Sequence, residues 1–379
     1  MDFSTVELSP DDQAFQRELR DFLAATVTDE VLARDRETGE NFDEGVHLAL
    51  GGAGYLAADY RSAADGGFSA VRRRIWELEV GRAHTPWFHW GTTAMVAHTV
   101  EQFASAELVD EVLPGVLAGG LRLCLGYTEP EGGSDVATCK TRAVRDGADW
   151  IINGSKMFTS NAHNAQYVFL VTNTDPEAPK HKSLTMFLVP LDAPGVEIQG
   201  IRTVDGDRTN ITYYSDVRVA DRYRVGEVNG GWAVLRGALD FEHGTFERDS
   251  AGLQKIATMT EHITLMAEAV DRVAAAVPDD EAARYRLGRG IARMEAAMST
   301  PQMYGRVAIA QTMRDVSPDL MDILGPAGSL TDGVEYIFRL AGPTGIYGGT
   351  LEVFRNMIAQ HGLGLGKPNY SPPAAKQTH

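Results

Sequence analysis

Near the middle of the chain the sequence reads Tyr127-Thr128-Glu129-Pro130-Glu131-Gly132-Gly133-Ser134-Asp135. The mostly apolar residues 122–127 predict a β-strand, so the segment that follows is a glycine-rich loop at the end of a strand. Glycine lets the backbone approach a ligand closely, and such a loop offers N–H groups and hydroxyls to a polar ligand. Taken alone, the same residues are also typical of an ordinary surface turn.

A second cluster, Asn153-Gly154-Ser155-Lys156-Met157-Phe158-Thr159-Ser160-Asn161, follows the next predicted hairpin. An aromatic side chain followed two residues later by a hydroxyl can stack on a flat ring and hydrogen-bond its edge. The alternative is that Phe158 packs inside the sheet as an ordinary strand residue.

Around these clusters, residues 119–222 are predicted to form a middle β domain, a small sandwich or barrel. Short runs rich in β-branched and aromatic residues recur there, and Asp146-Gly147 between two of them is a strong hairpin signal. The predicted strands are 122–127, 140–145, 150–153, 167–172, 184–189, 196–201 and 210–219.

Both flanks show helical spacing, which makes the predicted fold class α+β. In residues 1–118, Ser9-Pro10-Asp11-Asp12 has the composition of a helix start. Further helices are expected at 42–51, 68–83, 92–104 and 107–118. In residues 223–366, segments 231–272, 280–299, 300–324 and 332–361 predict an antiparallel four-helix bundle. Residues 367–379 are expected to form a loose tail.

Composition narrows the possible partners and the compartment. The 379 residues carry 35 basic and 52 acidic side chains, a net charge of −17, which disfavours nucleic acid and anionic lipid as partners. Two cysteines cannot form a disulfide framework, and no apolar run approaches a membrane span. The N-terminus lacks the features of a signal peptide, so we expect a cytoplasmic protein.

Several common site motifs are absent from the sequence. No Gly-x-Gly-x-x-Gly lies between a predicted strand and helix, and neither His-Glu-x-x-His nor Gly-x-Ser-x-Gly occurs. The ten histidines are scattered, so no metal site is expected.

Glu242 stands out among the acidic residues. It shares a helical stripe with Leu235, Leu239 and Phe246, which places a carboxylate on an apolar face. A carboxylate in apolar surroundings has a raised proton affinity and suits a general base near neutral pH. A buried ion pair or an edge position is the alternative.

The two clusters, in this order within a helix–strand–helix chain, resemble the acyl-CoA dehydrogenase family. The segment Ile346-Tyr347-Gly348-Gly349-Thr350-Leu351-Glu352-Val353-Phe354-Arg355 is similar to the last-helix motif of that family. The resemblance covers essentially the whole chain. Residues 126–131, 180–182 and 213–219 look most like the actinobacterial dehydrogenases of steroid side-chain breakdown.

The resemblance implies an FAD enzyme that converts an acyl-CoA to a 2-enoyl-CoA. A carboxylate removes the α-proton, and the β-hydrogen leaves as hydride to flavin N5. Tyr127 and Thr128 would contact the flavin, Ser134 the flavin or CoA phosphates, and Thr350 would lie near the flavin. Phe158 takes the place of a stacking tryptophan, and Ser160 that of a hydroxyl near N5. The family passes electrons to an electron-transfer flavoprotein.

The departures from the family pattern are informative. Most members place the base directly after the tyrosine of the last-helix motif, where this chain has Gly348. Branched-chain and long-chain members carry it on an earlier helix in a Leu-Asp-x-Glu-Arg context, which Leu239-Asp240-Phe241-Glu242 matches. The resemblance thus implies that Glu242 is the base, with Asp240, His243 and Gly348 near the substrate. The missing side chain at Gly348 suits a bulky, branched or steroid side-chain acyl group.

Two elements that complete a neighbour's FAD site are degraded. The Arg-x-x-Phe-Gly pattern is absent around residues 284–294, and the Gln-x-x-Gly-Gly motif reads Asp322-Ile323-Leu324-Gly325-Pro326. The resemblance therefore implies a homologous but non-identical partner subunit in a heterotetramer. Two alternatives stay open: a non-catalytic scaffold subunit and a flavin monooxygenase on the same fold.

Overall fold

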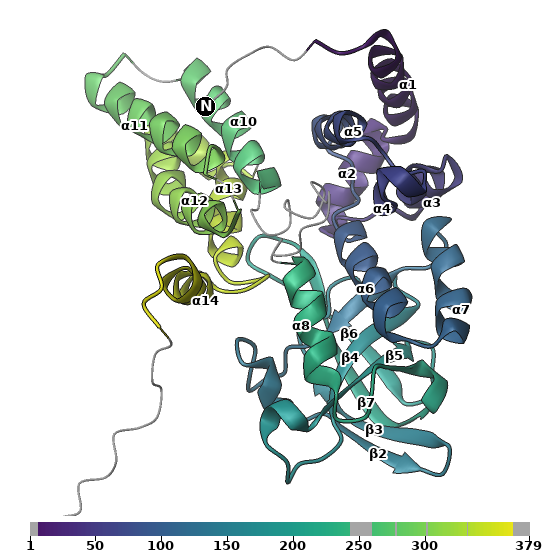
Figure 1. Cartoon of the computed structure of the whole chain (residues 1–379). Coiled ribbons are helices and arrows are strands. Elements are labelled where there is room, and N and C mark those ends of the chain that lie inside the picture. Colours follow the sequence, from purple (N-terminus) through teal and green to yellow (C-terminus); the bar gives the residue numbers. More distant parts are fainter. Residues whose placement is uncertain (1–6, 243–259, 277–278, 301, 332, 367–379) are drawn as a thin grey trace, which may run out of the picture. The chain divides into compact units, whose positions relative to one another are not determined.

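The computed structural model describes residues 7–242, 260–276, 279–300, 302–331 and 333–366 (Figure 1). The chain divides into two compact units, Met1–Ala257 and Thr258–His379. The described residues of each unit enclose hydrophobic clusters of their own. No helix among the described residues is long and apolar enough to cross a membrane. The predicted tail, 367–379, lies outside the described residues.

The first unit begins with helices. Ser9 caps the first of them by accepting a hydrogen bond from the Asp12 N–H, and Pro10 is its first residue, as predicted. The other predicted helices of this part are confirmed as α3, α5, α6 and α7, whereas α2 and α4 were not predicted. The elements are α1 (Pro10–Thr26), α2 (Asp29–Thr38), α3 (Glu44–Gly52), α4 (Tyr55–Tyr60), η1 (Ala63–Asp65), α5 (Ala70–Arg82), α6 (Trp90–Phe103) and α7 (Ala106–Leu117).

A mixed sheet follows, and each of the seven predicted strands overlaps an observed one. The order is β6-β7-β3-β2-β4-β5-β8, and β1 pairs in parallel with β4. The Asp146-Gly147 hairpin is confirmed, with Gly147 at a φ of +63°. The strands are β1 (Leu123–Gly126), β2 (Arg142–Asp146), β3 (Asp149–Lys156), β4 (Tyr167–Asn173), β5 (Leu184–Pro190), β6 (Val196–Arg202), β7 (Arg208–Ala220) and the unpredicted β8 (Arg224–Val225), with short turns η2 (Val136–Thr138), η3 (Lys180–Lys182) and η4 (Asp221–Tyr223).

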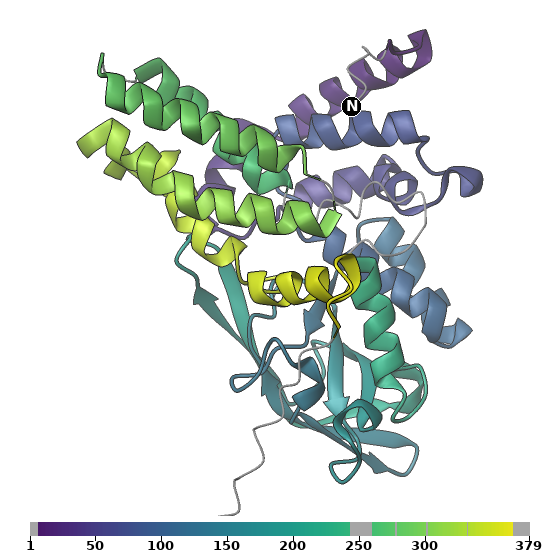
Figure 2. The same cartoon turned by 60° about the vertical axis from the view of Figure 1, so that its left-hand side comes forward.

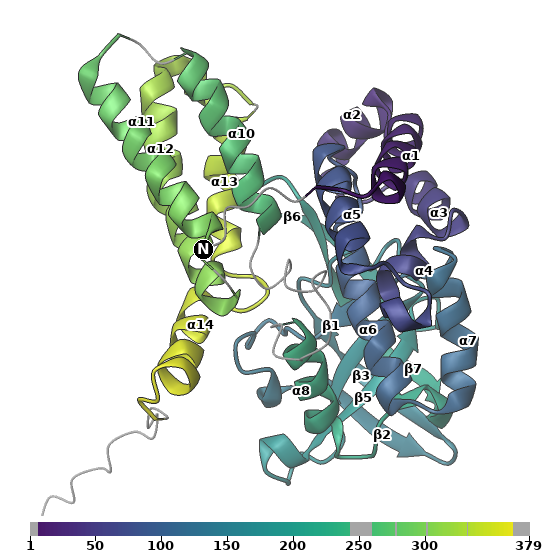
Figure 3. The same cartoon turned by 45° about the horizontal axis from the view of Figure 1, so that its top comes forward.

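The sheet is buried on both faces at its centre, which fixes its register. Alternate residues of β4 enter different clusters: Phe169 and Val171 pack with the helices, whereas Val168 and Leu170 pack with the other strands. This is the two-residue alternation expected of a strand. Helix α6 contacts β1 and α7 (Figure 3).

Helix α8 (Gly231–Glu242) differs from its expected place in the bundle. It belongs to the first unit and contacts β5 and α6, because Val234, Leu235 and Ala238 enter the same core as those elements. The expectation that segment 231–272 belongs to the bundle as a whole is therefore wrong. The predicted domain boundaries at 118, 222 and 366 stay predictions.

The second unit contains the four-helix bundle. Its members are α10 (Thr260–Ala276), α11 (Glu281–Met298), α12 (Gln302–Leu324) and α13 (Val334–Thr344), which lie along one another and share one apolar core (Figure 2). The predicted helix 332–361 is interrupted between Thr344 and Leu351, where Gly348 and Gly349 have positive φ. Helix α14 (Leu351–Met357) and the π-helical turn η6 (Ile358–Gly362) follow, and η5 (Gly325–Ser329) ends α12.

Candidate functional site

The glycine-rich loop after β1 closes on itself. The Glu129 N–H donates to the Gly132 carbonyl at 2.9 Å, and the Gly132 N–H donates back to the Glu129 carbonyl at 3.1 Å. A side chain at Gly133 would begin 3.3 Å from the Thr128 methyl group, so the loop is compact against Thr128. Ser134, two residues after Gly132, is exposed. The loop therefore exposes the Ser134 hydroxyl to solvent, while its first residues pack tightly against each other.

The base of the loop is anchored by a buried ion pair. Glu129 accepts hydrogen bonds from Lys156 Nζ at 2.7 Å, from Thr141 Oγ1 at 2.7 Å and from the N–H groups of Lys140 and Thr141 at 2.7 and 2.8 Å. Lys156 is 0% exposed. Burial works to raise the pKa of Glu129, but the Lys156 charge and these hydrogen bonds outweigh it and lower the pKa to about 2. Glu129 and Lys156 thus tie the two sequence clusters together.

The second cluster forms a tight turn beside the first. The Met157 N–H donates to the Thr128 carbonyl at 2.8 Å. Phe158 has a φ of +55° and is 54% exposed, so it does not pack inside the sheet. Positive φ is uncommon for a bulky residue and persists only where neighbours hold it. Thr159, which is 0% exposed, holds this turn by donating its N–H to the Asn210 carbonyl at 2.9 Å.

Ser160 and its surroundings complete this surface. Ser160 is exposed, and its hydroxyl shares a 2.9 Å hydrogen bond with Thr209. The structure therefore brings the predicted residues Tyr127, Thr128, Phe158 and Ser160 onto two neighbouring turns of the first unit. An exposed aromatic ring next to hydroxyls and glycine backbone fits a flat, polar-edged ligand.

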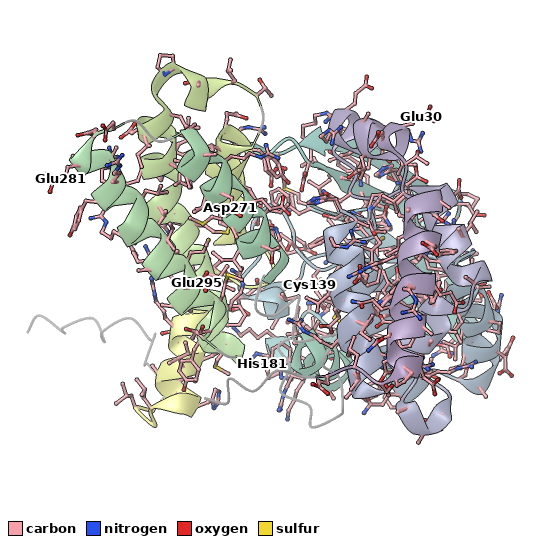
Figure 4. The ribbon with its side chains drawn as sticks, turned by 90° about the horizontal axis from the view of Figure 1, so that it is seen from above. Glu30, Cys139, His181, Asp271, Glu281 and Glu295 are labelled. Atoms are coloured by element: carbon pink, nitrogen blue, oxygen red, sulfur yellow. The ribbon has the colours of Figure 1, made fainter. Side chains whose placement is uncertain are left out.

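A basic loop lies next to the glycine-rich loop and was not predicted as part of the site. Lys180 in η3 forms an ion pair with Asp135 at 2.5 Å. His181 is labelled in Figure 4. Its ring centroid lies 4.4 Å from that of Trp232 in α8, and Lys182 is exposed. Three consecutive basic residues in a chain of net charge −17 were the available sequence signal.

Glu242, the predicted base, is the last residue of α8. It follows the buried Leu235 by seven residues and the buried Ala238 by four, the spacing of one helical face. Asp240 lies in the same helix, whereas His243 lies outside the described residues.

Thr350 and Gly348 belong to the second unit. Thr350 caps α14 by accepting a hydrogen bond from the Val353 N–H at 3.2 Å. The buried Arg306 donates to the carbonyls of Tyr347 and Gly349 at 2.7 and 3.2 Å and thereby fixes the glycine turn before it.

The degraded segments of the second unit form a charge network. Asp322 accepts from Arg286 at 3.0 Å, and Asp319 accepts from Arg286 and Arg289 at 2.6 and 2.7 Å. The charge of Asp322 is therefore compensated inside the chain by an arginine of α11. Helix α12 ends at Leu324, and Gly325 follows with a φ of +58°.

Within residues 7–242 and the described parts of 260–366, no group of three or more His, Cys, Asp or Glu side chains could hold a metal ion.

Comparison with known proteins gives matches along nearly the whole chain. Residues 9–120, 124–217 and 242–363 match the N-terminal, middle and C-terminal domains of acyl-CoA dehydrogenases. IpdE1 of Mycolicibacterium smegmatis, an acyl-CoA dehydrogenase, is 32% identical over 93% of this chain and 97% of its own length. FadE29 of Mycobacterium tuberculosis, also an acyl-CoA dehydrogenase, is 35% identical, but the match spans only 62% of each chain.

Solved structures agree with these sequence matches. The Tcur3481–Tcur3483 steroid ACAD superposes with a TM-score of 0.79, at 30% identity, over 96% of this chain and 100% of that one. The ChsE4–ChsE5 complex from Mycobacterium tuberculosis gives the same TM-score and coverage at 28% identity.

Proposed function

This chain belongs to the acyl-CoA dehydrogenase family, and from that premise we propose that it oxidises an acyl-CoA thioester to the 2-enoyl-CoA. The observation that carries the proposal is the pair of joined turns that hold Thr128 and the exposed Phe158 side by side. Both turns belong to the first unit of this chain.

The residues of these turns fit a flavin ring. Phe158 offers an exposed aromatic face, Thr128 and Ser160 offer hydroxyl groups, and Tyr127 offers its backbone. In the second unit, Thr350 is a further candidate contact. FAD, when bound, supplies the hydride acceptor for the substrate's β-carbon.

Glu242 is the proposed base for the α-proton. The sequence places Glu242 on the same helical stripe as Leu235 and Leu239. A carboxylate in apolar surroundings suits a general base near neutral pH, which this step needs. The Leu239-Asp240-Phe241-Glu242 context supports the same assignment, with Asp240 and His243 toward the substrate.

The CoA moiety carries phosphates, and the basic loop offers them a local positive surface. Lys182 and His181 are exposed, and Lys180 is tied by Asp135 to the loop that carries Ser134. We assign Ser134 and this basic loop to the anionic end of CoA, because local cations outweigh the overall negative charge at short range.

The proposed substrate class rests on Gly348, and the proposed partner subunit rests on the solved structures of relatives. Gly348 leaves space where other members carry a glutamate, which suits a bulky, branched or steroid side-chain acyl group. The ChsE4–ChsE5 and Tcur3481–Tcur3483 structures contain two different chains, which supports a homologous partner subunit here. An electron-transfer flavoprotein is the proposed electron acceptor, and the cytoplasm the proposed compartment.

The test is Glu242→Gln in the flavin-loaded protein, which keeps size and polarity but cannot accept the proton. Anaerobic mixing with a branched or steroid acyl-CoA should bleach the wild-type flavin. We expect the variant to bind flavin normally and to bleach about a hundredfold to ten-thousandfold more slowly. Glu227→Gln, at an exposed position just before α8, is the control and should be nearly silent. A Glu242→Gln rate within tenfold of wild type would move the base elsewhere.

A further inference from the structure

A cysteine lies against the buried ion pair that anchors the glycine-rich loop. Cys139 follows η2 and is 5% exposed (Figure 4). Its Sγ lies 3.2 Å from Lys156 Nζ and 3.2 Å from Glu129 Oε1. A thiol, an amine and a carboxylate therefore meet at contact distance in one buried site, and the proposed dehydrogenation uses none of them.

We propose that Cys139 and Lys156 form a covalent sulfur–nitrogen bond when the protein is oxidised by hydrogen peroxide. The thiol loses two electrons to one peroxide molecule, which gives a sulfenic acid and one water. As the Lys156 nitrogen attacks the sulfur, its ammonium proton passes to Glu129, because bonding to sulfur removes the basicity of the nitrogen. The S–N bond forms as the sulfenic S–O bond breaks, and the hydroxyl takes one nitrogen proton and leaves as a second water. This is the condensation by which sulfenic acids form sulfenamides.

The three side chains are arranged for this step. Lys156 Nζ and Cys139 Sγ are already in contact at 3.2 Å. The four-carbon side chain of lysine is flexible enough to bring them to bonding distance. Glu129 accepts from Nζ at 2.7 Å, so the proton acceptor is also in place. The product leaves no unpaired charge, because the neutralised lysine faces a protonated carboxyl group.

The second cysteine provides an internal comparison. Cys124 is 0% exposed, and its thiol donates to the Tyr167 carbonyl at 3.6 Å, a group that cannot form a bond with sulfur. Burial raises the pKa of both thiols, that of Cys139 to about 11, so oxidation is slow at either. Cys139 differs in having an amine that captures the sulfenic acid once it forms.

The bond would release the loop from its anchor. Lys156 is the cation that holds Glu129 ionised, and a sulfenamide nitrogen is not basic enough to replace it. Loss of the ion pair frees the base of the loop that carries Thr128. If the loop holds flavin, which rests on the proposed function, this oxidation lowers the activity of the enzyme.

The test treats the purified full chain with hydrogen peroxide and follows it by peptide mass spectrometry and thiol titration after denaturation. We expect a linked peptide pair, Cys139 to Lys156, that lacks two hydrogens relative to its separate parts. The two titratable thiols should fall to one and return to two after a thiol reductant. Cys124→Ser should still form the link, and Cys139→Ser should lose it.

Three results would overturn the proposal: a disulfide between the two cysteines, conversion of Cys139 to sulfinic or sulfonic acid without the link, or an unmodified Cys139 at peroxide levels that fully oxidise glutathione. Cys139→Ala is a second variant in case the serine destabilises the fold. Flavin release in step with the link, measured on the flavin-loaded protein co-expressed with a homologous subunit and absent from Cys139→Ser, is the functional readout. The peptide and thiol readouts stand even if the flavin site is wrong.

Discussion

Gly348 has a φ of +62°, a backbone conformation that most residues adopt only at a cost. We predict that Gly348→Glu does not restore a base but narrows the acyl pocket of the proposed site. The value of kcat/KM should fall more for bulky acyl-CoAs than for short ones. Strain from the left-handed backbone adds a general loss of stability of about 1–2 kcal/mol.

Gly348→Ala is the matched control, since it carries the same backbone strain without the carboxylate. The difference between the two variants isolates the effect of the side chain. Equal losses across chain lengths, or rescue of Glu242→Gln by Gly348→Glu, would contradict the prediction.

His47 gives the first unit a pH-dependent stability. It is 2% exposed, and both ring nitrogens lack a hydrogen-bond partner among the described residues. Burial, with the nearby Arg122 charge and His89, lowers its pKa from 6.5 to about 4. The unfolded chain therefore binds the proton first, and stability falls as the pH drops from 6.5 toward 4.

His47→Leu should remove this contribution. Between pH 7 and 5 the unfolding free energy of the wild type should fall by about 2 kcal/mol more than that of the variant. This follows because pH 5 lies about 1.5 units below the pKa of an unfolded histidine, and each unit is worth about 1.4 kcal/mol. Urea unfolding at the two pH values measures it. His181→Asn, at an exposed position, should keep the wild-type slope; a similar slope in His47→Leu would count against the assignment.

At the scale of elements, the Glu129–Lys156 pair joins the loop after β1 to the end of β3. Removing one partner of a buried pair leaves an uncompensated charge and costs about 3–5 kcal/mol. We predict that Lys156→Met destabilises the first unit by this order and loosens the flavin loop. Urea unfolding and flavin retention on gel filtration measure the two effects.

The double variant Glu129→Gln/Lys156→Met tests the cause. It leaves no buried charge, so it should recover part of the lost stability.

The stability that the ion pair contributes should also be lost in acid. The pKa of Glu129 is lowered from 4.5 to about 2, so this stability is present above pH 4.5 and disappears as the pH falls toward 2. A double variant less stable than Lys156→Met would refute the charge argument.

The elements that the sequence predicted are those with a clear apolar period. The alternation of β4 and the capped start of α1 are visible in the residues alone. Helix α2 was missed because it buries no side chain completely, and α8 was misplaced because its periodicity does not say which core it enters. The apolar stripe of a helix shows which face is buried, but it does not show which element that face packs against.

The same limit applies to the site. The motifs predict Phe158 and Thr128 as site residues, but they do not indicate that Glu129 and Lys156, which belong to the same motifs, form an ion pair. Nothing in their spacing shows that residues 27 positions apart meet at 2.7 Å. The basic loop was missed for a related reason, since its nearness to Asp135 comes from the fold of η3.

At the scale of the whole molecule, the residues with proposed roles are distributed over the sequences of both units. The first carries the aromatic turn, the glycine-rich loop and the helix of Glu242, whereas the second carries Thr350 and the altered segments at Arg286 and Asp322. Arg286 already donates to both Asp319 and Asp322, so this guanidinium is committed to its own chain. A diphosphate from a neighbouring chain would have to compete with two carboxylates for it.

That competition leads to the last prediction, which concerns assembly. FAD stabilises only a protein that binds it, so a chain that cannot complete its neighbour's site gains little from the cofactor. We predict that the chain expressed alone carries well below one FAD per chain and has a low melting temperature. Co-expression with a homologous acyl-CoA dehydrogenase subunit should raise both, measured by absorbance, light scattering and thermal unfolding. Asp322→Gln alone should not raise the flavin content, since Pro326 still removes a backbone donor at the same site. A homotetramer of this chain with one FAD in every subunit would show that the altered segments suffice and that no different partner is needed.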